Sequence, residues 1–375
     1  MNKLADEWLT MNKIVLYGWG NVGKKCFSKF KEDFDIVSII DNDPSKQGEF
    51  CGVPIVSAND AQDILQSNKI VVLTGGKVYK DIANSLTEIG LQEYIDFCSV
   101  EIFISEWYWN VKGQNCLLEV HTAVTMQCTF KCRNCNMFVP YYREKVNCSG
   151  TELKQMYDLF FKYVDYVFCI ALLGGEPFLS QATGEIINYL GKKYSSQIGV
   201  INIISNGSIV PDDETIEIMS KNNVLVYLSD YSSTVSYKEK LMQVVEKLTD
   251  NNIQYVLRSS EQWKDFGFPT VVPSIGKDVA EHMNTCAPLF HGLNDNKFYY
   301  CHVAWSAEKA GMYKLEKYDY IDLENLAMKD RRDIVYHALG FMEPQYVSLC
   351  KICGGCGSDN PNNVKAAIQM ETSYE

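Results

Sequence analysis

The sequence lacks any apolar run of about 18 residues or more, so it predicts no membrane-spanning helix. Its first residues, 1–8, contain no apolar stretch of the kind that a secretion signal needs, and we expect a cytoplasmic protein. Basic residues are also outnumbered, since 35 Lys and Arg stand against 47 Asp and Glu and leave a formal charge of −12. This balance argues against a nucleic-acid backbone as the main partner.

Cysteine, in contrast, is abundant, with 14 residues. In a protein expected in a reducing compartment, such cysteines are better explained as metal ligands than as disulfides. The densest group is Cys128, Cys132 and Cys135, which is spaced C-x3-C-x2-C and follows an apolar, strand-like run at 117–124. A fourth cysteine is missing at matching spacing, because Cys148 comes 13 residues later. Three thiolates on one loop can hold three irons of a [4Fe-4S] cluster and leave the fourth iron open for a small molecule.

Two other interpretations of these cysteines stay open, namely a zinc site that borrows a distant ligand and a set of unrelated buried thiols. A second motif bears on the choice. An apolar strand predicted at 166–173 leads into Gly174, Gly175, Glu176 and Pro177. Glycines at the end of a strand let a ligand reach the backbone, and the glutamate offers an acceptor for an ammonium group. A simple turn is the alternative.

The C-x3-C-x2-C loop and the Gly-Gly-Glu-Pro segment together resemble the radical S-adenosylmethionine (SAM) superfamily. In that family the open iron chelates SAM, and an electron from the cluster cleaves SAM to a 5'-deoxyadenosyl radical. The resemblance implies that Cys128, Cys132 and Cys135 hold the cluster and that residues 174–177 contact the amino group of SAM. It also implies a flavodoxin or ferredoxin as the electron donor.

One residue departs from the family pattern. The residue before the third cysteine is usually aromatic and packs near the adenine of SAM, but here it is Asn134. We expect Phe138 or Tyr141 to supply that surface instead.

Polar residues follow the next predicted strands, at 199–204, 224–228 and 253–257. Strands that alternate with helices in this way favour a parallel barrel with its function at the C-terminal strand ends. The polar residues at those ends are Ser205, Asn206, Ser229, Asp230 and Arg258. The resemblance implies a partial (β/α)6 TIM-like barrel over 105–270, in which these residues line SAM and then the substrate. Turn formation or surface exposure is the alternative for each of them.

A separate Rossmann-like α/β domain is predicted at 12–104, joined to the barrel by the aromatic and polar segment 106–114. A strand at 13–17 runs into a glycine-rich turn and a helix, and a second strand ends in an acid 18 residues after the last glycine. The residues concerned are Gly18, Gly20, Gly23 and Asp41. This order is typical of dinucleotide folds. Because the domain is short, NAD, another nucleotide or nucleotide-sugar, and a purely structural role all stay open.

A second group of cysteines falls in the predicted domain 271–360. Its members are Cys286, Cys301, Cys350, Cys353 and Cys356. The segment 291–301 between the first two predicts a two-stranded hairpin. The group resembles the Twitch domain, a shortened SPASM domain, which implies one auxiliary [4Fe-4S] cluster on the first four cysteines, with Cys356 as a substitute for one of the last pair. Structural zinc fits the same ligands. Residues 361–375 predict a polar tail that is mobile at its end.

The resemblance implies an enzyme that abstracts hydrogen from an unactivated C–H bond. We expect a carbohydrate, aminocyclitol or nucleotide-sugar substrate, because the Twitch architecture resembles radical SAM alcohol dehydrogenases and because such Rossmann-like modules occur on sugar-modifying enzymes. The expected reaction oxidises a secondary alcohol with the auxiliary cluster as electron acceptor, and Arg258 contacts a hydroxyl or phosphate of the substrate. The alternatives are an epimerase with Cys356 or Cys169 as hydrogen donor, a peptide-modifying SPASM-type maturase, and an iron–sulfur scaffold without activity.

Overall fold

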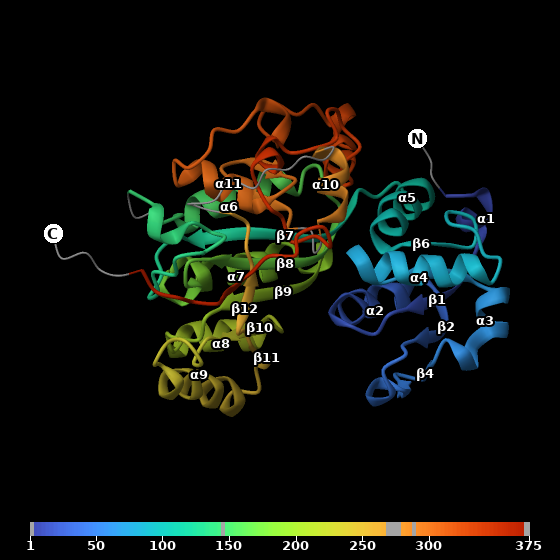
Figure 1. Ribbon diagram of the computed structural model, residues 1–375, viewed down its shortest axis with the longest axis horizontal. Coiled ribbons are helices and arrows are strands. Elements are labelled where there is room, and N and C mark those ends of the chain that lie inside the picture. The colour runs from blue at the N-terminus through green and yellow to red at the C-terminus, as the bar shows by residue number, and fades with distance from the viewer. Residues whose placement is uncertain (1–3, 144–146, 268–278, 287–289, 371–375) are drawn as a thin grey trace. The chain divides into compact units, whose positions relative to one another are not determined.

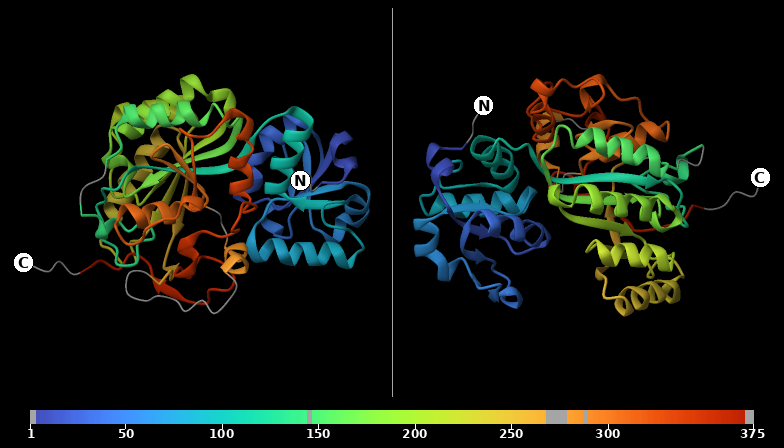
Figure 2. Two further views of the ribbon diagram at one scale, coloured as in Figure 1. Left: turned by 90° about the horizontal axis from the view of Figure 1, so that it is seen from above. Right: turned by 180° about the vertical axis from the view of Figure 1, so that it is seen from behind.

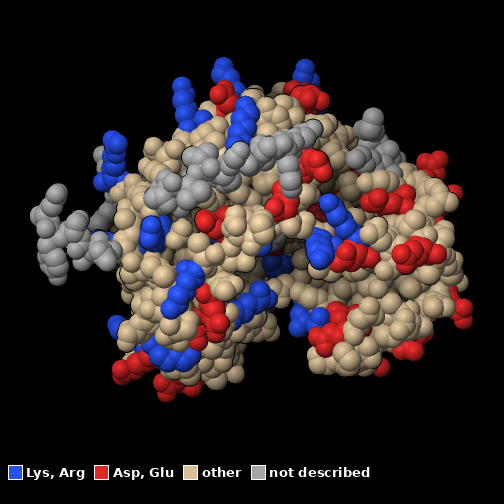
Figure 3. Space-filling view, viewed as in Figure 1, with Lys and Arg blue, Asp and Glu red and all other residues tan. Residues whose placement is uncertain are grey.

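The computed structural model describes residues 4–143, 147–267, 279–286 and 290–370 (Figure 1). The chain divides into two compact units: unit 1 is Met1–Leu118 with Val164–Phe168, and unit 2 is Glu119–Tyr163 with Cys169–Glu375. The predicted boundary between residues 270 and 271 lies outside the described residues. In the described ranges, no helix combines the length and the apolar character needed to cross a membrane. Basic and acidic side chains both occur across the face drawn in Figure 3.

Unit 1 is built on a six-stranded sheet with the order β3-β4-β2-β1-β5-β6. Its strands are β1 (Lys13–Tyr17), β2 (Asp35–Ile40), β3 (Gly48–Phe50), β4 (Val53–Val56), β5 (Lys69–Val72) and β6 (Phe97–Ser99). All neighbouring pairs are parallel except β3 with β4. Because both faces of β1 and β5 are covered, Val15 and Ile70 are fully buried, as the apolar runs of these strands predict.

The α-helices of unit 1 are α1 (Asp6–Thr10), α2 (Asn21–Asp33), α3 (Gln62–Ser67), α4 (Gly76–Glu88) and α5 (Val100–Lys112). The predicted connection at 106–114 is wrong, because most of it belongs to α5. This helix starts at Ser99, whose hydroxyl accepts a hydrogen bond from Ile102 N, and its C-cap is Gly113 at φ 65°. Trp107 of α5 packs on Phe34 with ring centroids 4.4 Å apart. A helix that is buried on most sides has little amphipathic pattern, so the sequence pattern did not indicate α5 as a helix.

Unit 2 is built on an eight-stranded sheet with the order β11-β10-β9-β8-β7-β13-β14-β15. Figure 2 gives two further views of the chain. The strands are β7 (Cys116–Thr125), β8 (Tyr166–Gly174), β9 (Ile198–Ser205), β10 (Leu225–Asp230), β11 (Gln254–Ser259), β13 (Gly292–Asn294), β14 (Lys297–Tyr299) and β15 (Tyr320–Asp322). Strand β10 is parallel to both β9 and β11. The strands predicted from 117 to 257 are confirmed. The sixth unit of the predicted barrel has no counterpart among the described residues, where the series runs from β7 to β11.

The helices between these strands are α6 (Gly150–Phe160), α7 (Ala182–Lys193), α8 (Asp213–Lys221) and α9 (Lys238–Asp250). Figure 1 shows them following the strand order. A capping box starts α6: Ser149 Oγ accepts from Glu152 N, and the Glu152 carboxylate accepts from Ser149 N. Fully buried residues such as Ile186 and Leu241 face the sheet, as helices packed on a sheet require.

The predicted hairpin at 291–301 is confirmed by β13 and β14. Asp295 and Asn296 form its turn with positive φ angles of 54° and 57°, the conformation that two-residue hairpin turns need. The helices around it are α10 (Val279–Thr285), α11 (His302–Lys309) and α12 (Asp333–Ala338).

The tail predicted at 361–375 is not free over its first ten residues. Strand β16 (Asn363–Lys365) pairs antiparallel with β12 (Gln262–Lys264), and Ala366 and Ala367 are fully buried. The polar sequence did not predict this strand pairing, because the pairing uses backbone groups. The rest of the predicted tail, 371–375, lies outside the described residues.

Candidate active site

The loop that follows β7 carries the first group of cysteines. Cys128 Sγ accepts hydrogen bonds from Phe130 N and Asn206 Nδ2, both at 3.4 Å. Cys132 Sγ accepts one from Gln369 Nε2 at 3.3 Å. Burial raises the pKa of Cys128 to about 12 and that of Cys132 to about 11, so a metal has to displace protons to bind. The N–H donors are suited to the negative charge that would then lie on the sulfurs.

Two glycines bring the end of β8 against this loop. Gly175 N donates to Thr125 O at 2.8 Å, and Glu176 N donates to Gln127 O at 2.7 Å. A Cβ atom on Gly174 would lie 2.0 Å from Thr125 O, and one on Gly175 would lie 2.0 Å from Gln127 O. Because they lack a Cβ, the two glycines allow the backbone at Thr125 and Gln127, just before the cysteine loop, to come close to β8. The sequence predicted that these glycines make room for a ligand and did not predict this packing role.

The Glu176 carboxylate joins the ends of β8 and β9. It is fully buried and accepts hydrogen bonds from Ser205 Oγ at 2.8 Å, Asn206 N at 2.8 Å and Phe178 N at 3.2 Å. Burial raises its pKa to about 7. The predicted hydrogen bond from an ammonium group to Glu176 differs from this arrangement, because the carboxylate oxygens already accept hydrogen bonds from groups of the chain itself.

A cavity of about 670 Å³ lies at these strand ends, within unit 2. It brings together ten of the predicted site residues: Cys128, Cys132, Cys135, Gly174, Gly175, Ser205, Asn206, Ser229, Arg258 and Cys356. Its size falls within the range of about 300–1,000 Å³ that is usual for small-molecule sites. The carboxyl ends of parallel strands meet at one edge of a sheet, which is why positions spread over more than 200 residues line one space.

The cysteine loop is suited to a [4Fe-4S] cluster on two grounds. Its three cysteines line the same cavity, and N–H donors lie within hydrogen-bonding distance of two of the three sulfurs. Among the described residues, no group of three or more His, Cys, Asp or Glu side chains is arranged to hold a single metal ion.

No protein-family model matches this chain, and no curated protein sequence matches it. Three solved structures are similar to it. One is anSMEcpe with AdoMet and the Cp18Cys peptide bound (TM-score 0.41, 14% identity, 64% of this chain and 89% of that chain). Another is BtrN in complex with AdoMet and 2-DOIA (0.40, 11%, 63% and 92%). The third is SuiB of Streptococcus suis bound to precursor peptide SuiA (0.31, 13%, 80% and 82%).

The resemblance of the C-x3-C-x2-C loop and the Gly-Gly-Glu-Pro segment to the radical SAM superfamily stays a prediction. In the structure, the cysteine loop and the two glycines of that segment line the same cavity. The two motifs thus occupy one place in the fold although they are separated in the sequence.

Four predicted residues of the radical SAM region do not line the cavity. Besides Glu176 these are Pro177, which begins a short 3-10 helix, Asp230 and Cys169. The Asp230 carboxylate accepts from Lys238 Nζ at 2.7 Å and from Ser232 N at 2.8 Å, and Cys169 is fully buried in β8. The predicted roles of Pro177 and Asp230 in cofactor binding have no geometric support in the described residues.

Aromatic surface in the cavity comes from positions that the sequence did not suggest. Neither Phe138 nor Tyr141 lines it, whereas Asn134 does. The aromatic residues of the wall are Phe130, Tyr231, Trp263, Phe266 and Phe290. The sequence signal for Trp263 was weak, because it lies just beyond the last strand of the predicted core.

Two buried histidines, His121 and His302, also line the cavity and were missed. The side chain of Asn294 determines which ring nitrogen of His302 carries the hydrogen. Its Oδ1 accepts from Ala123 N at 3.0 Å and its Nδ2 donates to Ala123 O at 3.0 Å, so the amide cannot be reversed. His302 Nε2 lies 2.9 Å from the same Oδ1 and therefore donates. His302 Nδ1 is then a bare acceptor, and it is buried with no partner among the described residues.

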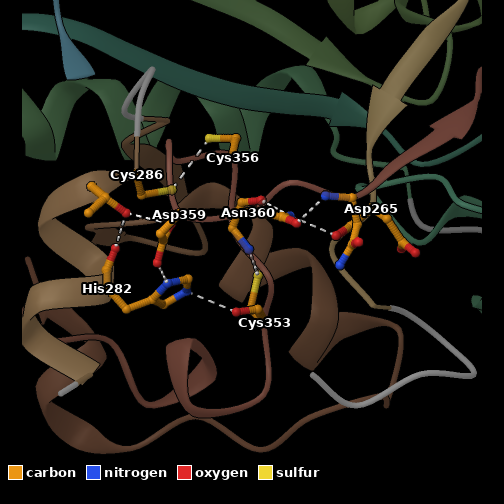
Figure 4. Close-up of polar contacts among 10 residues, drawn as sticks. Asp265, His282, Cys286, Cys353, Cys356, Asp359 and Asn360 are labelled. Carbon is orange, nitrogen blue, oxygen red and sulfur yellow. Dashed lines mark hydrogen bonds and ion pairs between the residues drawn. The ribbon is translucent and has the colours of Figure 1, made fainter. Parts of the chain in front are cut away.

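The second group of cysteines gathers around α10. Burial is the main cause of the raised pKa of Cys350, and the nearby thiols of Cys301, Cys353 and Cys286 raise this pKa further by electrostatic repulsion. Cys356 approaches Cys286 with the sulfurs 3.4 Å apart, as Figure 4 shows. The hydrogen bond between the two thiols lowers the pKa of Cys286. The five predicted ligands are thus neighbours, and Cys356 also lines the cavity at the ends of the strands.

Polar side chains brace this second group (Figure 4). His282 Nδ1 pairs with Asp359 Oδ2 at 2.6 Å, and His282 Nε2 lies 2.9 Å from Cys353 O. Asn360 Nδ2 donates to Asp265 O at 2.9 Å and to Gly355 O at 2.8 Å. Such bonds hold the Cys353–Cys356 loop in shape, as ligand loops require.

The glycine-rich turn of unit 1 is closed by its own side chains. Asp41 Oδ2 accepts from Trp19 N at 2.8 Å and from Lys46 Nζ at 3.0 Å. A Cβ on Gly23 would lie 2.6 Å from Gly18 O, so this glycine is needed for packing. The predicted nucleotide contacts of Gly18, Gly20, Gly23 and Asp41 stay a prediction.

Proposed function

We propose that this protein is a radical SAM oxidoreductase that converts a secondary alcohol of a carbohydrate, aminocyclitol or nucleotide-sugar into a ketone. Cys128, Cys132 and Cys135 would hold the SAM-binding cluster. Cys286, Cys301, Cys350 and Cys353 would hold an auxiliary [4Fe-4S] cluster, which supplies an electron acceptor when bound.

One observation carries the proposal: a single cavity is lined by the cysteine loop on one side and by Cys356 of the second group on another. An electron leaving a substrate in that cavity would have a short path to the second group. A cavity of about 670 Å³ that also holds SAM suits a small substrate better than a long peptide.

The reaction balances in atoms and electrons. One electron from a flavodoxin or ferredoxin cleaves SAM to methionine and the 5'-deoxyadenosyl radical. That radical takes the hydrogen atom from the carbinol carbon. Loss of the hydroxyl proton to solvent and of one electron to an auxiliary cluster, which the second group of cysteines would hold, would then turn the substrate radical into the ketone. The residues of the chain have to orient the alcohol and accept its hydroxyl hydrogen bond.

Two residues that line the cavity are suited to that task. His302 carries a buried acceptor, Nδ1, that has no partner among the described residues and could take a hydroxyl hydrogen after a small movement of the ring. Arg258, at the end of β11, lies over the Tyr227 ring at 5.5 Å and offers donors to a hydroxyl or phosphate oxygen. Polar groups on an aromatic wall are typical of sites for polyhydroxylated rings.

Epimerisation is the second candidate, because Cys356 carries a thiol into the cavity and could return a hydrogen atom to the substrate radical. Maturation of a peptide is the third. No observation favours it over the sugar reaction.

The deciding experiment is deuterium transfer. The anaerobically reconstituted full chain is mixed with SAM, dithionite and one perdeuterated compound at a time: myo-inositol, glucose, UDP-glucose or a mixed peptide pool. We expect deuterium in 5'-deoxyadenosine and a ketone product from a polyol. Transfer from the peptides alone would reject the proposal. A triple Cys128/Cys132/Cys135→Ala variant, which should form no 5'-deoxyadenosine, is the control.

A further inference from the structure

Residues 366–370, which we call the C-terminal strap, follow β16 and run along the cysteine loop. Arg133 N donates to Ile368 O at 2.8 Å, and Met370 N donates to Lys131 O at 2.8 Å. Two backbone hydrogen bonds of this kind make an antiparallel bridge to the loop. The strap is thus attached to the cysteine loop rather than lying free.

The Gln369 side chain reaches a cysteine sulfur from the strap. Its Oε1 accepts from Lys131 N at 2.8 Å, which requires oxygen on that side of the amide. Its Nε2 therefore points the other way, donating to Cys132 Sγ at 3.3 Å and to Ala367 O at 2.8 Å. The orientation of the amide, and so the N–H···S hydrogen bond, follows from a backbone donor of the loop itself.

The inner side of the strap is apolar. Ala367 is fully buried and packs with Phe130 and Cys132, next to Tyr231 and Trp263. Ala367 has a φ of 57°, and the chain turns toward the loop there. This backbone conformation is strained for a residue with a Cβ, so the packing of Ala367 has to offset the strain. The strap therefore covers part of the loop with packed side chains.

The same stretch of chain connects the two cysteine groups. After Cys356 it passes Asn360, pairs through β16 with β12, whose three residues line the cavity, and ends on the cysteine loop. A displacement of the strap would thus disturb the cavity wall and the loop together.

We propose that the C-terminal strap shields the SAM-binding cluster and sets its reduction potential, with Gln369 as a positioning residue that acts through Cys132. The inference rests on the proposed function, because it requires a cluster on the loop. A hydrogen bond to a ligand sulfur stabilises the more negative, reduced state and so raises the potential. The backbone bridge and Ala367 limit the access of solvent and oxygen.

The test uses the full chain, reconstituted, with Gln369→Met, which keeps the length of the side chain but removes its donor. Ile368→Ala is the matched control, because Ile368 bonds the loop only through its backbone. We expect the midpoint potential of the SAM-binding cluster, followed by electron paramagnetic resonance, to become more negative in Q369M and to stay unchanged in I368A. A chain ending at Lys365 should lose iron several-fold faster in air. Equal potentials and equal rates of iron loss would overturn the inference.

A metal-free measurement separates this inference from the proposed function. Hydrogen exchange of the full-length apo protein should show protection at the amides of Arg133 and Met370, and truncation at Lys365 should abolish the protection of Arg133. Protection, together with a cluster that binds but never cleaves SAM, would reject the proposed function and leave the strap intact. Absence of protection would reject the strap even in an active enzyme.

Discussion

His302 donates a hydrogen bond from Nε2 to Asn294 Oδ1 over 2.9 Å, which leaves its Nδ1 as a buried acceptor without a partner among the described residues. Asn294 belongs to β13 and is held by two hydrogen bonds to Ala123 of β7, so the sheet itself determines the tautomer of the histidine. His302 also stacks on Trp305 with an interplanar angle of 14°, which keeps the ring in place.

The first prediction separates the two nitrogens of His302. Replacement by Gln keeps a donor toward Asn294 and removes the acceptor at the Nδ1 position, whereas replacement by Asn does the reverse. A buried hydrogen bond to substrate is worth about 1–2 kcal/mol. We therefore expect H302Q to lose roughly tenfold in kcat/KM for the labelled polyol while H302N retains more, with SAM cleavage in the absence of substrate unchanged in both. Nitrogen-15 NMR of the free protein should find Nδ1 unprotonated; a protonated Nδ1 would contradict the assignment.

The second prediction concerns Gly175. In Gly175→Ala the new methyl group would lie 2.0 Å from Gln127 O, a backbone atom that cannot yield without moving the cysteine loop. We expect a loss of about 3 kcal/mol in the free energy of unfolding and a strong fall in bound iron. Gly20→Ala is the control, because a Cβ at that position meets nothing within 4 Å and should change the free energy of unfolding by only a few tenths of a kcal/mol. Equal effects would disprove the packing argument.

The third prediction is a pH dependence due to Glu176. Burial raises its pKa in the folded protein to about 7, against 4.5 for the ordinary group. Between these values the unfolded chain releases the proton and the folded protein keeps it, so the free energy of unfolding falls as pH rises, by about 3 kcal/mol in total. Urea unfolding from pH 4 to 8 should show this slope in the wild type and a slope smaller by one proton in Glu176→Gln. Identical slopes would mean that Glu176 ionises normally.

The fourth prediction distinguishes the two roles open to Cys356. If Cys356 is a hydrogen donor, Cys356→Ala keeps the iron content of the wild type, roughly eight per chain for two clusters, but loses product. If it is a ligand, iron falls to about four. The proposed ligands are Cys286, Cys301, Cys350 and Cys353, so we expect the iron content to stay; a fall would mean that Cys356, whose sulfur lies 3.4 Å from that of Cys286, replaces one of them. Cys148→Ala serves as the control, because Cys148 lies outside the cavity and its thiol donates to Ala123 O.

Much of the site was accessible from local sequence. The spacing of Cys128, Cys132 and Cys135 and the strand ends at Ser205, Ser229 and Arg258 were predicted, and all of them line the cavity. Such predictions succeed because a cysteine loop and a strand end are local features, and because parallel strands bring their carboxyl ends to one edge.

The misses share a different cause. Helix α5 was mistaken for a connection because burial on most sides removed its amphipathic pattern. The segment 361–370 was assigned to a tail without a partner strand, because its attachment uses backbone hydrogen bonds and the small side chains of Ala366 and Ala367. Neither kind of contact leaves a pattern along the chain.

The sequence by itself determined where strands and helices alternate and which cysteines share a loop, and its motifs carry the resemblance to radical SAM proteins. Only the tertiary structure decided what each polar group does. Glu176 joins two strands instead of facing the cavity, His302 presents a bare nitrogen, and Gln369 reaches Cys132 across 237 positions of the sequence. The physical reason is that metal-ligand spacing is local, whereas the partner of a hydrogen-bonding group depends on which distant segments the core brings together.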